Sequence, residues 1–262
     1  MDAATMTGRV LVCLWVLLVA HDVSAASEKV SMSIRGQTQT LTFYRPSAGV
    51  PVKGTILMGS GDVGWVGLAV DLAGFLAEQG YAVIGINARL YLASYTSRGR
   101  HVLPAEVTAD YASIVQFMRD RHTLWEPIVV AGVSEGAALA ILAGARVNHS
   151  WVRGVMTMGL PASAELAWRW KDAVAWITKQ DSAEPSFEPA MFISEVSPVP
   201  LWMIQSTKDE YVTRSDFLML EAAARAPKRL VLVDASNHRF TDRLPLLREH
   251  VLAGLAWMKS SP

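Results

Sequence analysis

Cysteine is nearly missing from this chain of 262 residues, since Cys13, close to the N-terminus, is the only one. A single cysteine cannot form an internal disulfide. If the N-terminal segment is removed on export, as argued below, the mature chain has no thiol. A cysteine nucleophile and a thiolate metal site are then excluded.

An excess of charge is missing too. Lys and Arg together number 24, as do Asp and Glu, so the net charge is zero and nothing favours a nucleic acid as partner. Four of the six histidines (His101, His122, His149 and His250) lack the spacing to Asp or Glu that would suggest a metal site. We therefore expect no metal and no cofactor.

Only a short apolar run stands at the N-terminus. The run Val10–Ala20 follows Arg9 and is too short to span a bilayer comfortably. It precedes Val23-Ser24-Ala25, a small-residue cleavage pattern, with Ala26 as an alternative end. This arrangement predicts a signal peptide over residues 1–25, a mature domain over 26–262 and a periplasmic or secreted location. An uncleaved membrane anchor is the alternative.

What is present is a hydrophobic chain with regular alternation. Apolar residues make up 51% of the sequence and charged residues 18%, which suits one domain with a substantial core. "EKVSMSIRG" and "QTLTFYRP" predict a β-hairpin around Gly36-Gln37. Apolar strands then alternate with helices, which predicts a mostly parallel sheet covered on both faces. The expected strands are GTILMG, YAVIGINA, PIVVAG, VRGVMTM, PLWMIQS and RLVLVDA, and the expected helices are Val66–Gln79, Pro104–Arg121, Gly136–Arg146, Arg214–Arg225 and Asp242–Lys259.

One irregular region, residues 161–198, follows the sixth strand, counted with the two strands of the hairpin. It is too long for a simple connection, so we expect a short insertion or small cap over the sheet edge. Within it, a period of two places Leu166, Trp168 and Trp170 on one side and Arg169 and Lys171 on the other, which favours a strand with an apolar face. The tryptophans would pack on the core or line a site for an apolar or lipid-like substrate.

Gly59, Gly61 and Gly64 form a G-x-G-x-x-G pattern between a strand and a helix. A dinucleotide site would have this context, but the next strand ends at Asn87 and Arg89 with no carboxylate for a ribose, and no Tyr-x-x-x-Lys is present. The alternative is a loop that donates a backbone N–H to an oxyanion hole. Asp62 is the first choice as donor, with Ser60 and Gly61 as rivals.

The pentapeptide Gly132-Val133-Ser134-Glu135-Gly136 lies between a predicted strand and a small-residue helix. This context is typical of a nucleophile elbow, which requires a carboxylate after a later strand and a histidine after the last one. Asp209 and His238 meet both requirements. Ser134, His238 and Asp209 are thus predicted as nucleophile, base and acid, and the N–H of Glu135 as the second oxyanion donor. Glu210 or Asp234 could replace Asp209.

The segments "GSGDVGW", "INARLYLASYTSRG" and "GVSEGA" resemble the exported virulence-associated proteins of the VirJ and AcvB type, with less specific similarity from about Lys53 to the C-terminus. Val63 and Val133 depart from the family's glycine and tyrosine. The resemblance implies an α/β-hydrolase fold and a periplasmic serine hydrolase, and members of the family hydrolyse aminoacyl-phosphatidylglycerol.

The sequence therefore predicts an exported serine hydrolase of carboxylic esters, with a small-molecule or lipid ester as substrate and peripheral contact with a membrane surface. A non-catalytic periplasmic binding or assembly factor on the same scaffold is the alternative. Glu135 and Asp62 could face a cationic aminoacyl group, and Arg89, Arg98 and Arg100 a lipid phosphate. Further candidate substrate contacts are Ser60, Gly61, Trp65, Val133, Arg89 and Trp168.

Overall fold

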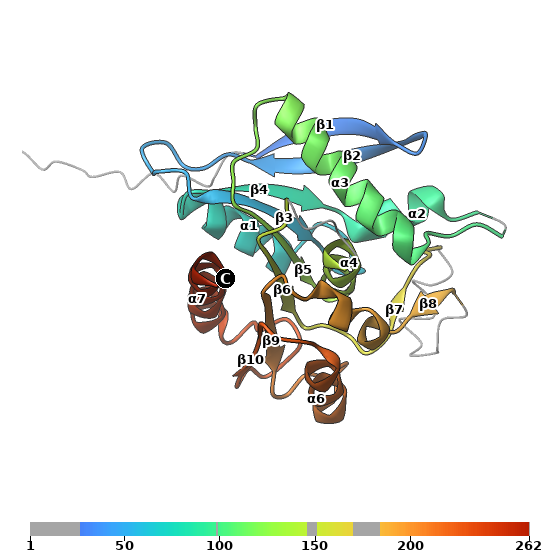
Figure 1. The fold of residues 1–262 in the computed structure, drawn as a ribbon, viewed down its shortest axis with the longest axis vertical. Coiled ribbons are helices and arrows are strands. Elements are labelled where there is room, and N and C mark those ends of the chain that lie inside the picture. The colour runs from blue at the N-terminus through green and yellow to red at the C-terminus, as the bar shows by residue number, and fades with distance from the viewer. Residues whose placement is uncertain (1–26, 98, 146–150, 170–183, 262) are drawn as a thin grey trace, which may run out of the picture.

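The computed structural model describes residues 27–97, 99–145, 151–169 and 184–261. The predicted signal peptide and Arg98 lie outside these ranges. An eight-stranded sheet runs in the order β1-β2-β4-β3-β5-β6-β9-β10 (Figure 1). Its strands are β1 (Ser27–Ile34), β2 (Gln37–Tyr44), β3 (Gly54–Gly59), β4 (Tyr81–Ile86), β5 (Ile128–Val133), β6 (Gly154–Met158), β9 (Leu201–Ser206) and β10 (Lys228–Val233).

The N-terminal hairpin is the antiparallel part of the sheet. β1 pairs with β2, and β2 pairs antiparallel with β4, whereas the other neighbouring strands are parallel. The hairpin turn is Arg35-Gly36, one residue earlier than the predicted Gly-Gln, and both residues have positive φ (49° and 77°). Two positive φ angles match the right-handed twist of the flanking strands in a two-residue turn.

Complete burial explains the continuous apolar runs of the parallel strands. Every residue of β3, β5, β6 and β9 is buried, whereas the edge strand β10 is partly exposed. Two hydrophobic cores form, one on each face of the sheet. α1 (Leu68–Glu78) and α7 (Leu244–Ser260) cover one face, and α2 (Ala88–Tyr95), α3 (Pro104–Asp120), α4 (Glu135–Gly144) and α6 (Arg214–Ala223) lie on the other (Figure 1).

The predicted helices agree with the structure to within about two residues at each end, but α2 was not predicted. Its sequence reads as the end of a strand followed by a loop. These residues form a helix instead, because the Asn87 side chain accepts a hydrogen bond from the Leu90 N–H at 3.1 Å and caps the helix. α2 therefore begins directly after β4.

The insertion differs from its prediction in two respects. Its described parts pack against α4 and α6 rather than over the sheet edge. They hold β7 (Ala164–Glu165), β8 (Ser186–Phe187) and the 3-10 turns η1 (Pro189–Met191) and η2 (Ile193–Val196). Residues 166–169 form no strand, so the predicted alternating strand is wrong there. Trp170 lies outside the described residues. The alternation fails because residues 166–168 all pack inward, with Leu166 and Ala167 buried and Trp168 packed against the core.

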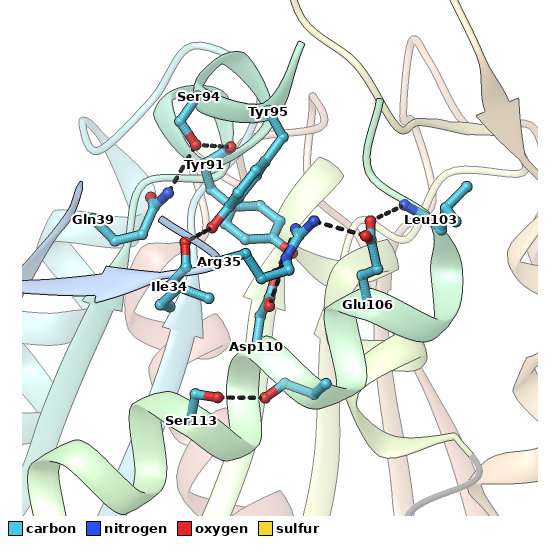
Figure 2. Close-up of polar contacts among 11 residues, drawn as sticks. Ile34, Arg35, Gln39, Tyr91, Ser94, Tyr95, Leu103, Glu106, Asp110 and Ser113 are labelled. Carbon is cyan, nitrogen blue, oxygen red and sulfur yellow. Dashed lines mark hydrogen bonds and ion pairs between the residues drawn. The ribbon is translucent and has the colours of Figure 1, made fainter. Parts of the chain in front are cut away.

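A buried polar cluster fastens the hairpin to the helices beside it (Figure 2). The Arg35 guanidinium binds Asp110 of α3 through both carboxylate oxygens, with a shortest distance of 2.7 Å, and contacts Glu106 at 2.8 Å. The Tyr91 hydroxyl of α2 donates to the same Asp110 at 2.6 Å, and the Tyr95 hydroxyl donates to the Ile34 carbonyl. The hairpin tip, α2 and α3 are thus joined at one carboxylate.

Candidate active site

Ser134 lies on a sharp turn between β5 and α4. Its backbone has φ 53° and ψ −120°, a conformation that costs energy for any residue except glycine. The Ser134 N–H donates to the Met158 carbonyl at 2.9 Å. A Cβ on Gly132 would overlap the Gly136 carbonyl, and a Cβ on Gly136 would overlap the Gly59 carbonyl. The glycines allow strand, helix and turn to approach closely enough to present the serine.

Asp209 and His238 are paired. Asp209 follows β9, and its Oδ2 lies 2.7 Å from Nδ1 of His238, which follows β10. The other carboxylate oxygen accepts the N–H groups of Tyr211 and Val212, at 2.9 and 3.0 Å. The Asp209 side chain is fully buried, so these bonds hold the carboxylate in one orientation toward the imidazole.

The two alternative acids have other partners. Glu210 Oε2 accepts the backbone N–H of His238 at 2.7 Å, so it binds the histidine's main chain rather than its ring. Asp234 is exposed and pairs with Lys208 at 2.9 Å. The imidazole of His238 therefore contacts Asp209 alone among these three carboxylates.

Two residues that the sequence did not single out enclose the imidazole. The Tyr211 ring meets it edge-on, with centroids 5.3 Å apart. Gly159, directly after β6, has φ 63°, and a Cβ there would stand 2.6 Å from His238 Cε1. A glycine directly after the apolar run VRGVMTM was the available signal for this second contact.

Ser134 and His238 open into one cavity of about 380 Å³. Its wall also contains Gly61, Asp62, Val133 and Glu135, four of the predicted oxyanion or substrate residues. The remaining wall is mostly apolar and includes Val63, Val66, Gly67, Leu68, Ala69, Tyr211 and Arg239. The cavity thus offers a hydroxyl, an imidazole and an apolar surface to one ligand.

The loop after β3 lies against the elbow. A Cβ on Gly61 would stand 3.5 Å from the Ser134 Cβ. In the described part of the chain, the backbone N–H groups of Gly61, Asp62 and Glu135 have no hydrogen-bond acceptor, whereas the Ser60 N–H donates to the Ile86 carbonyl. Ser60 is thereby removed as an oxyanion donor, and Gly61 and Asp62 are left as candidates on this loop.

The Glu135 carboxyl has an unusual environment. It accepts a hydrogen bond from the Glu165 N–H. Burial, followed by the negative charges of Glu165 and Asp62, raises the pKa of Glu135 to about 8, although the hydrogen bond from Glu165 opposes this shift. The side chain is therefore mostly protonated at neutral pH.

Four predicted substrate contacts lie elsewhere. Ser60 is fully buried, and its hydroxyl accepts the Ala88 N–H at 3.1 Å. Trp65 covers Gly85, and its indole N–H donates to the Tyr44 hydroxyl at 3.3 Å.

Arg89 and Trp168 stack on each other, with the guanidinium carbon 5.1 Å from the ring centroid. Like Ser60 and Trp65, they are absent from the cavity wall that the described residues form. The sequence could not separate Ser60 and Trp65 from the cavity wall, because they adjoin Gly61 and Val66, which do line it. Arg89 and Trp168 were predicted from side-chain chemistry, which does not fix where a residue lies.

The glycine loop serves packing. A Cβ on Gly59 would be 2.9 Å from Gly136 Cα, and one on Gly64 would be 3.3 Å from the Asn87 amide.

Within the described ranges, no group of three or more His, Cys, Asp or Glu side chains is arranged to hold a metal ion. In the same ranges, no helix combines the length and apolar character needed to cross a membrane.

The parallel sheet, the strained serine turn and the Asp–His pair after the last two strands define an α/β hydrolase fold. A sequence model described as "Bacterial virulence protein (VirJ)" matches residues 54–242, and the chain belongs to this family. Both results confirm the predicted fold and family, and they leave the dinucleotide interpretation without support from the fold. No curated protein sequence matches the chain.

Solved structures share the fold at low sequence identity. An esterase domain from Rhodothermus marinus is 20% identical over 89% of this chain and 99% of its own, with a TM-score of 0.61. The α/β serine hydrolase XC6422 from Xanthomonas campestris, described as lacking a lid, is 17% identical over 90% and 97%, with a TM-score of 0.60. A putative dienelactone hydrolase from Klebsiella pneumoniae is 15% identical over 90% and 98%, with a TM-score of 0.64.

Proposed function

We propose that this protein is a serine hydrolase that cleaves carboxylic esters through an acyl-enzyme formed on Ser134. The observation that supports it most is the Asp209–His238 pair, at 2.7 Å, which shares one cavity with a serine on a strained turn. A buried carboxylate on Nδ1 leaves Nε2 of the imidazole to act as a base. The esterase and serine hydrolase descriptions of the structural neighbours agree with this proposal.

The steps follow from the groups in the cavity. His238 removes the Ser134 proton as the hydroxyl oxygen attacks the ester carbonyl carbon, and the negative charge passes to the carbonyl oxygen. The unbonded N–H groups of Glu135 and of Asp62 or Gly61 stabilise that oxyanion. His238 then donates the proton to the leaving alcohol, and water releases the acid by the same sequence.

For the substrate, we propose an aminoacyl ester, with aminoacyl-phosphatidylglycerol as the leading candidate. Family membership supports this choice, and so does the presence of Asp62 in the cavity wall, because its carboxylate can attract an amino group. A lipid substrate would require contact with a membrane surface. The sequence pattern of residues 1–25 supports export to the periplasm, where such contact occurs on the outer face of the inner membrane.

A fluorophosphonate probe tests the mechanism directly. We expect the full-length protein to be labelled at Ser134, and Ser134→Ala to lose both labelling and ester hydrolysis, by about 10⁴-fold or more relative to the wild type. Unchanged hydrolysis by Ser134→Ala would contradict the mechanism, and an unlabelled wild type would favour a binding or assembly factor. Incubation with a total lipid extract then identifies which ester, if any, is consumed.

A further inference from the structure

One hydrogen bond joins the first turn of α4 to the insertion that follows β6. Glu135 is the first residue of α4 and directly follows Ser134, and its carboxyl accepts the backbone N–H of Glu165 in β7. Thirty residues separate the two groups in sequence. The side chain next to the serine thus anchors the start of the insertion.

The segment between β6 and β7 touches the histidine as well. Gly159 is packed against the His238 ring with no room for a side chain. The chain then runs over six residues to Glu165, so the segment 159–165 contacts the histidine at one end and α4 at the other. An anchor at Glu165 restrains both the imidazole contact and the first turn of α4.

The far side of β7 is fastened independently. The Leu166 N–H donates to the Pro185 carbonyl, and the Leu166 carbonyl accepts the Val102 N–H at 2.9 Å. The Trp168 N–H donates to the Thr96 hydroxyl at 3.0 Å. These bonds hold β7 toward α2 and α3, and the Glu135 carboxyl ties β7 to the serine turn.

We infer that Glu135 is a positioning residue, whose carboxyl oxygen holds segment 159–165 between α4 and His238 and so keeps the Glu135 backbone N–H and the imidazole correctly placed relative to Ser134. The inference rests on the proposed function and adds a side-chain role to a residue otherwise used for its main chain. It predicts that an acceptor oxygen is needed at this position and that a charge is not.

Glutamine is the suitable replacement. Its amide oxygen accepts the Glu165 N–H, and its NH₂ group takes the place of the carboxyl O–H. Alanine removes the acceptor oxygen from the Glu165 N–H. Glu165→Ala is the matched control, since it removes a neighbouring carboxylate and keeps the peptide N–H. These three variants separate the hydrogen bond from the charge.

The experiment measures kcat and KM for p-nitrophenyl acetate with the four full-length proteins. We expect Glu135→Ala to lower kcat by about 10- to 100-fold with little change in KM, because misplaced groups affect the reacting geometry more than binding. Glu135→Gln and Glu165→Ala should stay within about threefold of the wild type. Equal losses in Glu135→Gln and Glu135→Ala, or no loss in Glu135→Ala, would overturn the inference.

Hydrogen exchange provides a readout that does not depend on activity. Amide exchange in residues 159–166 should be faster in Glu135→Ala than in the wild type, and Glu135→Gln should restore the slow exchange. If the wild type is inactive and unlabelled by fluorophosphonate, the proposed function fails, while exchange still tests the anchor. Identical exchange in all four proteins would show that Glu135 does not hold the segment.

Discussion

Two adjacent carboxyl groups contact His238, and they contact different parts of it. Asp209 binds the ring nitrogen Nδ1, whereas Glu210 binds the backbone N–H. From the sequence, either could have been the acid. If Glu210 could substitute for Asp209, the loss of Asp209 would be mild. The observed geometry argues against such a substitution, because the Glu210 carboxylate already accepts the backbone N–H of His238.

Asp209→Asn should therefore lower kcat by about 10³- to 10⁴-fold, since an amide no longer fixes the imidazole tautomer or stabilises its cation. Glu210→Gln retains an acceptor oxygen for the His238 N–H and should cost less than about tenfold. Steady-state ester hydrolysis by both variants, with circular dichroism as a folding control, measures the difference. Similar losses in the two variants would mean that both carboxyls act on the imidazole.

Glu135 should give stability a distinctive pH dependence. Its pKa rises from an unfolded value of 4.5 to about 8, so the folded protein binds this proton more tightly than the unfolded chain. The protonated Glu135 carboxyl makes its full contribution to the free energy of unfolding below about pH 4.5, and this contribution is lost as the pH rises through about 8. Glutamine cannot ionise, so the free energy of unfolding of Glu135→Gln should increase relative to that of the wild type between about pH 5 and pH 8.

Urea unfolding at a series of pH values measures this difference. The free energy of unfolding of Glu135→Gln minus that of the wild type should grow steadily with pH across this range. A constant difference would mean that the Glu135 carboxyl has an ordinary pKa.

At the scale of single elements, the serine turn depends on how closely α4 approaches β3. Gly136 lies against the Gly59 carbonyl, and neither backbone has room for a Cβ. Gly74 provides a contrast, because it lies in α1, where an added Cβ would meet no atom within 4 Å. Gly136 and Gly74 differ in what surrounds them, although both lie in helices.

Gly136→Ala should destabilise the protein by about 1–3 kcal/mol, because overpacking forces the helix away from the strand. It should also reduce fluorophosphonate labelling, since Ser134 directly precedes this turn of the helix. Gly74→Ala should instead stabilise the protein by about 0.5–1 kcal/mol through its better helix propensity. Thermal unfolding measures both, and a neutral Gly136→Ala would refute the close-packing argument.

The elements that the sequence predicted well are those with a strong repeating pattern. The buried strands and the helices after them have such patterns, and the serine turn has a fixed pentapeptide. α2 was missed because a single cap at Asn87 determines it. Residues 166–169 were misassigned because large apolar side chains two positions apart suggested a strand, whereas Leu166, Ala167 and Trp168 all pack inward. Local patterns do not record which residue touches which partner, so Ser60 and Trp65 seemed equivalent to Gly61.

At the scale of the whole molecule, the order of strands brings together residues that are far apart in the chain. The serine, the carboxylate and the histidine each follow a parallel strand, and parallel strands end at the same edge of the sheet. This rule let the sequence predict the three residues together. It gives no information on the N-terminal hairpin, whose attachment depends on a cluster of side chains.

That cluster centres on Asp110, whose side chain is 2% exposed and accepts hydrogen bonds from Arg35 and Tyr91 (Figure 2). Removal of the Asp110 carboxylate leaves the Arg35 guanidinium and the Tyr91 hydroxyl desolvated without their acceptor. Asp110→Ala should therefore lower the free energy of unfolding by about 3 kcal/mol. Arg119→Ala on the same helix is the control, because its pair with Glu126 is exposed and should contribute at most about 1 kcal/mol.

Differential scanning calorimetry of both variants tests this assignment, with an expected fall in Tm of about 6–12 °C for Asp110→Ala. Because Asp110 joins the hairpin tip to α2 and α3, exchange should rise in the turn at Arg35-Gly36 as well as in α3. If exchange rose in α3 alone, the hairpin would be held by its strand pairing with β4 and not by the cluster. An equal effect of Arg119→Ala would show that burial of Asp110 adds nothing to the stability of the fold.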